Sequence, residues 1–214
     1  MCSPSFKLSY ESVVLDAEDI KILETSTWFN DKLLTFMGEY LMNSMNGRGE
    51  EEEEKKIHVF SPSETEMIRH SPSQMVEELF GGLGVDRVPI VAWIMSNNEV
   101  VTRAYGGSHW SLLVFHRPTK RFHHFDSFQR SNERAADSLR RKTRNLVDPR
   151  GESEDILETR DCIQQTNSSD CGLFVAQFLA TLVEKGDPEA IGELKKVEKT
   201  RKWWRDFILN FEME

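Results

Sequence analysis

One segment of this chain, residues 173–183, is apolar on nearly every side of a helix. A helix without a polar face is stable in water only where other elements surround it. The rest of the chain must therefore supply the elements that bury it. Residues 88–95 form a second apolar run of strand length, which predicts a strand buried on both faces. Together they predict a globular domain built around a central helix and a covered sheet.

Periodicity and capping residues predict the other elements around these two. Helices are expected from Asn30, Ser61 and Ser71, over 131–146 as a basic surface helix, and around residues 203–211. Strands are expected within 5–15, at 59–60, at 110–115 and 122–126 as a hairpin, and at 156–159. Helices, then a mixed sheet, then helices predict an α+β fold. We expect one domain over 1–214, with residues 47–56, including the run Glu50 to Glu54, as an acidic surface loop.

Charge and hydropathy exclude several classes of partner. The formal net charge of −9 argues against nucleic acid, because phosphate binding needs a basic face. No apolar stretch is long enough to span a membrane, and the first residues lack an export or lipidation signal. We therefore expect no membrane partner, a monomer, and a location in the cytoplasm or nucleus.

The 3 cysteines are sparse and include no C-x-x-C pair, so neither a disulfide framework nor a cysteine zinc site is expected. Cys171 differs from Cys2 and Cys162 by its position. Asp170 is a plausible helix cap, which places Cys171 in the first turn of the buried helix, where backbone N–H groups favour a thiolate nucleophile. The alternative is a small apolar residue that packs at a helix start.

A cysteine nucleophile needs a base and a group that orients the base. If the strands 110–115 and 122–126 pair antiparallel, His109 before the first lies beside Asp126 at the end of the second. His123 and His124 point to opposite faces and are expected at the surface or in packing. A zinc site from His116, His123 and His124 is the alternative, with poor ligand spacing. We expect no metal and no cofactor.

Four segments in this order resemble the ubiquitin-like-protein-specific cysteine proteases, the sentrin/SUMO protease family related to adenovirus protease. Residues 165–174 resemble the nucleophile segment, with its Gln six residues before the cysteine of Asp-Cys-Gly. Residues 106–113 resemble the His-Trp segment, and residues 125–127 the Asp-Ser segment. Residues 28–31 resemble the Trp-Leu-Asn-Asp box, with Phe29 in place of Leu.

The resemblance implies a papain-like core in the circularly permuted order His-Asp-Cys, with a mixed, mostly antiparallel sheet flanked by helices. It implies that Cys171 is the nucleophile, His109 the base and Asp126 its orienting carboxylate. Gln165 would donate a hydrogen bond to the oxyanion that develops during the reaction. The alternative is that Gln165 only stabilises the loop in which it lies. Trp28 and Trp110 would cover a narrow channel for a Gly-Gly tail rather than pack in the core. Asp31 would bind that tail, although a helix-start role explains it nearly as well.

Within the family, Gly106-Gly107 before Ser108, the run 126–132 and Glu39-Tyr40 are more like the small deneddylases than the SUMO proteases. The implied function is cleavage after the C-terminal Gly-Gly of a Nedd/Rub modifier, by deconjugation and precursor processing. A SUMO-specific protease is the first alternative. A catalytically inactive modifier-binding module and a His-acid-Cys acetyltransferase are the others.

Overall fold

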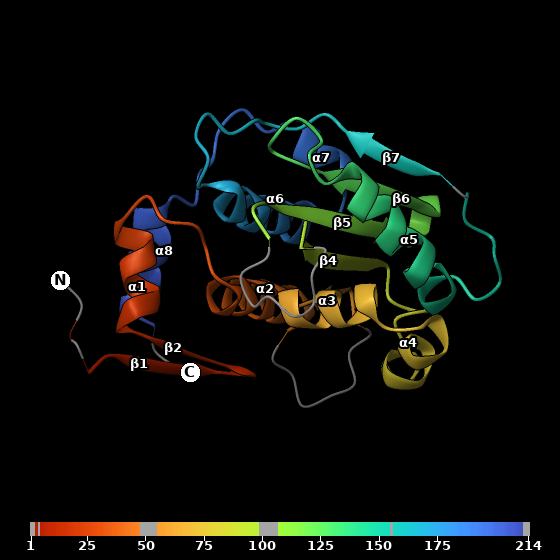
Figure 1. Ribbon diagram of the computed structural model, residues 1–214, viewed down its shortest axis with the longest axis horizontal. Coiled ribbons are helices and arrows are strands. Elements are labelled where there is room, and N and C mark those ends of the chain that lie inside the picture. The colour runs from red at the N-terminus through yellow and green to blue at the C-terminus, as the bar shows by residue number, and fades with distance from the viewer. Residues whose placement is uncertain (1–2, 4, 48–54, 99–106, 155, 212–214) are drawn as a thin grey trace.

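The fold centres on a five-stranded sheet of order β3-β4-β5-β6-β7 (Figure 1). The structure is a computed structural model that describes residues 3, 5–47, 55–98, 107–154 and 156–211. The β3–β4 and β6–β7 pairs are parallel, whereas β4–β5 and β5–β6 are antiparallel. The expected mixed sheet is confirmed, and its two antiparallel pairs are longer than its two parallel pairs. The strands are β3 (Ile57–Phe60), β4 (Ile90–Ser96), β5 (Trp110–His116), β6 (Arg121–Phe125) and β7 (Leu157–Arg160).

Helices cover both faces of this sheet, as the apolar run at β4 predicted. Alternate side chains of β4 point to opposite faces of the sheet and enter two separate cores. The first core contains Ile90, Ala92 and Ile94, and the second contains Val91, Trp93 and Met95. Every residue of β4 is buried, because a covered sheet leaves no polar face. The first core lies under α2 (Asp31–Asn46) and α6 (Cys171–Lys185); the second lies under α3 (Pro62–His70), α4 (Ser73–Phe80) and α5 (Glu133–Val147).

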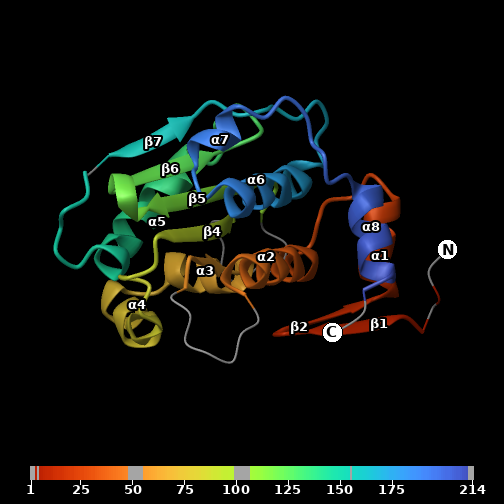
Figure 2. The same ribbon diagram turned by 180° about the vertical axis from the view of Figure 1, so that it is seen from behind.

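The predicted central helix is α6, which Figure 2 shows in front of the sheet. Its buried residues extend from Cys171 to Leu182. At its first turn the chain needs a glycine, because a Cβ on Gly172 would lie 2.6 Å from the Cβ of Phe29. The close approach of Phe29 brings the segment before α2 directly against the start of α6.

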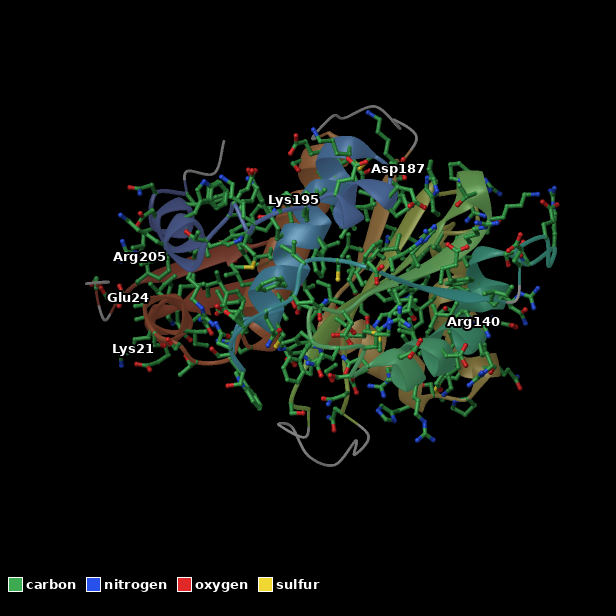
Figure 3. The ribbon with its side chains drawn as sticks, turned by 90° about the horizontal axis from the view of Figure 1, so that it is seen from above. Lys21, Glu24, Arg140, Asp187, Lys195 and Arg205 are labelled. Atoms are coloured by element: carbon green, nitrogen blue, oxygen red, sulfur yellow. The ribbon has the colours of Figure 1, made fainter. Side chains whose placement is uncertain are left out.

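The N-terminal and C-terminal segments meet at one end of the sheet (Figure 1). A hairpin of β1 (Lys7–Tyr10) and β2 (Val13–Asp16) leads into α1 (Ala17–Glu24), which packs beside α8 (Arg201–Leu209). Arg205 Nη1 of α8 lies 3.9 Å from Glu24 Oε1 of α1, and Figure 3 shows both residues on the outside of this end of the molecule. The helix α1 was not predicted, although Asp16 and Asp19 form a capping box at its start.

The helices α4 and α5 are each partly buried. Met75 and Leu79 of α4 are 46% and 53% exposed, whereas Val76 and Phe80 of the same helix are buried. The helix α5 is only partly at the surface, since Ala136, Leu139 and Leu146 are buried. The short helix α7 (Glu189–Gly192) follows Asp187, whose side chain accepts a hydrogen bond from the Glu189 N–H. The run Glu50 to Glu54 lies outside the described residues, and no helix among those described could cross a membrane.

Candidate active site

His109 and Asp126 form a buried pair at one end of the β5–β6 hairpin. His109 directly precedes β5 and Asp126 directly follows β6, and the antiparallel register pairs Leu112 with Phe125. The His109 Nε2 lies 2.5 Å from Asp126 Oδ1, and the two residues are 6% and 3% exposed. The predicted proximity of this imidazole and this carboxylate is confirmed.

Two asparagines hold this pair, and sequence reasoning missed both. Asn132 donates its N–H to Asp126 Oδ2 (2.8 Å) and its Nδ2 to the His109 carbonyl (3.2 Å). Asn97 accepts the His109 N–H on Oδ1 (3.1 Å) and donates its own N–H to the His109 carbonyl (3.2 Å). Asn132 lies in the run 126–132 that distinguished the deneddylase-like branch, which was the available signal. Nothing in the local sequence pattern singles out Asn97.

Electrostatics favour the charged forms of both members of the pair. Burial lowers the pKa of His109, but hydrogen bonds with Asp126 and Cys171 outweigh it and raise that pKa to about 9. Burial raises the pKa of Asp126, yet the neighbouring imidazole and the N–H groups of Asn132 and Phe128 hold it below its ordinary value. Because His109 Nε2 is hydrogen-bonded to Asp126, Nδ1 is the ring nitrogen that remains for the hydrogen bond with Cys171.

Cys171 is the first residue of α6 and is 1% exposed. It lines the same cleft as His109. Asp170 occupies the N-cap position as expected, but its side chain makes no capping hydrogen bond. Its carboxylate instead accepts Arg201 Nε (2.7 Å), and Arg201 also donates to the carbonyl of Ser169 (3.0 Å). Asp170 is therefore the N-cap residue by position, as predicted, but its oxygens bind other groups: Arg201 binds Oδ1, and Asn167 Nδ2 donates to Oδ2 (2.7 Å).

Gln165 lies in the loop before α6 and is 9% exposed. Its Oε1 accepts a hydrogen bond from Ser127 Oγ (2.8 Å), and its Nε2 donates to the Asn167 carbonyl (2.6 Å). Its backbone N–H also donates to the Ser127 carbonyl (2.8 Å). The side chain is thus tied to the Asp126 loop on one side and to the Cys171 loop on the other.

Trp28, Asp31 and Trp110 line one cleft of about 770 Å³ together with His109 and Cys171. Trp28 is 47% exposed there, whereas Trp110 is half-buried and donates Nε1 to the Phe29 carbonyl (3.0 Å). Partial burial and the nearby Glu66 raise the pKa of the Asp31 carboxyl. The charged residues of the cleft lining are mostly acidic, namely Asp16, Glu18, Asp19, Asp31 and Glu66, and Lys32 of the same lining pairs with Asp16 and Asp19.

The environments of His123, His124 and Cys162 differ from those of His109 and Cys171. His123 and His124 are buried in packing, so the surface alternative is wrong for both, and burial lowers the pKa of each to about 4. No group of three metal ligands occurs among the described residues, which leaves the zinc alternative unsupported there. Burial raises the pKa of Cys162 to about 11, so its thiol stays protonated and is a poor nucleophile.

Comparison with known proteins agrees with this geometry. Residues 27–207 match the model of the "Ulp1 protease family, C-terminal catalytic domain". The chain belongs to the Ulp1 protease family. It is therefore a cysteine protease of the kind that is specific for ubiquitin-like modifiers.

Relatives within the Ulp1 family include mouse sentrin-specific protease 8, which is 29% identical over 94% of this chain and 91% of its own length. NEDD8-specific protease 1 of Arabidopsis thaliana is 29% identical over 83% of this chain and 75% of its own. Among solved structures, the yeast Ulp1 protease domain in complex with Smt3 has a TM-score of 0.72 at 19% identity. That match covers 95% of this chain and 87% of the other. This likeness shows the Ulp1-like fold.

Proposed function

We propose that this protein cleaves after the C-terminal Gly-Gly of a Nedd8-type modifier, with Cys171 as the nucleophile. The observation that carries the catalytic assignment is the buried His109–Asp126 pair at 2.5 Å in the cleft that Cys171 lines. Thiol, imidazole and carboxylate are the three groups that acyl transfer through a cysteine requires.

The reaction divides among these side chains as follows. The Cys171 sulfur attacks the carbonyl carbon of the modifier's last glycine, and His109 carries the proton taken from the thiol. When the tetrahedral intermediate collapses, the bond from that carbon to the leaving nitrogen breaks, and His109 passes the proton to this nitrogen. Water then hydrolyses the acyl-enzyme, and Cys171 is released. Asp126 fixes the tautomer and orientation of His109 throughout.

Gln165 and the Cys171 backbone N–H are the proposed donors to the oxyanion that develops on the attacked carbonyl. The two hydrogen bonds of the Gln165 side chain fix its position between the Asp126 and Cys171 loops. Donors held in advance stabilise a developing charge without a reorganisation cost at the moment of reaction. Trp28 and Trp110 are proposed to enclose the Gly-Gly tail, which has no side chains that a narrow channel would reject.

Two observations support a Nedd8-type modifier over SUMO. Relatives named sentrin-specific protease 8 and NEDD8-specific protease 1 match this chain at 29% identity over most of its length. The carboxylates in the cleft lining, Asp31 among them, are complementary to a tail with basic residues before Gly-Gly. Asp31, at the start of α2, is the proposed contact for such a tail.

A panel of three lysine conjugates tests the modifier preference. With Nedd8, SUMO and ubiquitin each linked to the same lysine peptide, we expect the highest kcat/KM for Nedd8, by about 100-fold or more. That ratio corresponds to the few kcal/mol that mismatched buried groups cost. Fastest cleavage of the SUMO conjugate would contradict the preference while leaving the catalytic assignment intact.

The elevated pKa of His109 predicts an alkaline limit of activity. The imidazolium is present below about pH 9 and loses its proton above it, so the donor to the leaving nitrogen disappears as the pH rises through that value. We expect kcat/KM for conjugate cleavage to fall tenfold per pH unit above about 9. Alkylation of Cys171 by iodoacetamide needs no proton donor and is expected not to fall over the same range. A parallel fall of both rates would indicate alkaline unfolding instead.

A further inference from the structure

Phe128 is an exposed aromatic residue beside the candidate catalytic histidine. Its side chain is 44% exposed, although Ser127 before it is 1% exposed and Asn132 after it is fully buried. The Phe128 ring centroid lies 5.9 Å from that of His109, with an angle of 54° between the ring planes. A ring that is 44% exposed leaves an apolar face next to His109 that a bound molecule can contact.

The backbone after Phe128 is strained in a way that maintains this exposure. Gln129 and Arg130 are consecutive non-glycine residues with φ of 49° and 61°, in the left-handed region that L-residues rarely adopt. Such strain persists only where neighbouring contacts fix the chain, and it is concentrated at functional sites. Here the Phe128 N–H donates to Asp126 Oδ1 (2.9 Å) and the Gln129 N–H donates to Gln164 Oε1 (2.9 Å).

The position of Phe128 relative to the cleft identifies what it can touch. Trp28, Trp110, His109 and Cys171 line the cleft proposed to hold the modifier's tail, and Phe128 is not among its lining residues. The leaving nitrogen takes its proton from His109 and must therefore lie beside the imidazole. A group that contacts His109 from outside the tail cleft is placed to meet the segment attached to that nitrogen.

We propose that Phe128 contacts the leaving group, namely the aliphatic stem of the conjugated lysine, and so favours isopeptide conjugates over other acyl derivatives of the modifier. This inference rests on the proposed function, because it uses His109 as the proton donor. A lysine stem presents four methylene groups that pack well against an aromatic face. The contact forms only with substrates whose leaving group extends beyond the attacked carbonyl.

Two substrates that share the modifier and differ in the leaving group test the proposal. One is the modifier linked to the ε-amine of a lysine peptide, and the other is the methyl ester of the modifier, whose leaving group is too small to reach Phe128. In Phe128→Ala we expect kcat/KM for the lysine conjugate to fall about three- to tenfold. The methyl ester is expected to react within about twofold of the unsubstituted protein. Phe128→Tyr is expected to keep both rates.

Leu79→Ala is the matched control, since Leu79 is a 53% exposed apolar residue on α4, away from the cleft. It should change neither rate. If Phe128→Ala lowers kcat/KM equally for both substrates and shifts the alkaline limit of activity, the proposal is overturned. That result would show that Phe128 only shields the His109–Asp126 pair. Unchanged rates on both substrates would also overturn it. If circular dichroism shows that Phe128→Ala is unfolded, Phe128→Leu takes its place. The quantity compared is again the ratio of kcat/KM for the lysine conjugate to kcat/KM for the methyl ester.

Failure of the proposed function gives a different result. If the unsubstituted protein cleaves neither substrate of any modifier, the function itself is wrong. If it cleaves both and the ratio of their rates is unchanged in Phe128→Ala, only the role of Phe128 is wrong.

Discussion

Replacing Cys171 with alanine is expected to lower kcat for conjugate cleavage by at least about 10⁵-fold, because Cys171 supplies the only thiol among the described residues that line the cleft. The Kd for the modifier is expected to stay within a few-fold, since the proposed tail contacts come from Trp28, Asp31 and Trp110. Single-turnover kinetics measure the first quantity, and titration calorimetry with the free modifier measures the second.

Cys162→Ser is the control for that substitution. The Cys162 thiol donates to the Asp126 carbonyl (3.3 Å), and a serine hydroxyl can donate to the same oxygen. We expect this variant to retain cleavage within about tenfold, well inside the range of non-catalytic effects. Substantial activity in Cys171→Ala would show that another residue is the nucleophile.

Replacing Asp126 with asparagine is expected to lower kcat/KM by about 10³- to 10⁴-fold, with the fold retained. The neutral amide no longer stabilises the imidazolium, and it can donate to His109 and so favour the wrong tautomer. The pKa of His109, raised to about 9 by its partners, is expected to fall toward its ordinary value, which moves the alkaline limit to lower pH. The pH profile of kcat/KM measures both effects.

Asp187→Asn is the matched control, because Asp187 is an exposed carboxylate that accepts the Glu189 N–H ahead of α7 and does not line the cleft. In Asp187→Asn, neither kcat/KM nor its pH profile should change. An unshifted alkaline limit in Asp126→Asn would mean that Asp126 does not set the protonation of His109.

Much of the fold could be predicted because its core elements have strong periodic patterns. The helix α6 and the strand β4 are apolar on all sides, and the residues before and after them carry turn or capping signals. The helix α1 was missed because its buried apolar residues are only Ile20 and Leu23 and no glycine marks its end, whereas Ser71-Pro72 and Gly81-Gly82 bound the equally short α4. The parallel pairing of β3 with β4 and of β6 with β7 depends on segments distant in sequence, which local patterns do not encode.

The candidate site could be predicted where it follows from neighbouring elements. Antiparallel pairing of one hairpin was sufficient to bring His109 beside Asp126, and a helix start was sufficient to single out Cys171. Arg201 was missed because its hydrogen bonds reach the Ile22 carbonyl, 179 residues away, as well as Asp170. Contacts of such separation are properties of the folded chain and leave no pattern around the residue itself.

The most direct test of the central claim is to locate the covalent adduct formed with a Nedd8 probe that carries a C-terminal electrophile. After digestion and mass spectrometry, we predict the adduct on Cys171, lost in Cys171→Ala and slowed in Asp126→Asn. An adduct on Cys162, or no adduct with Nedd8 under conditions in which a SUMO probe reacts, would contradict the account.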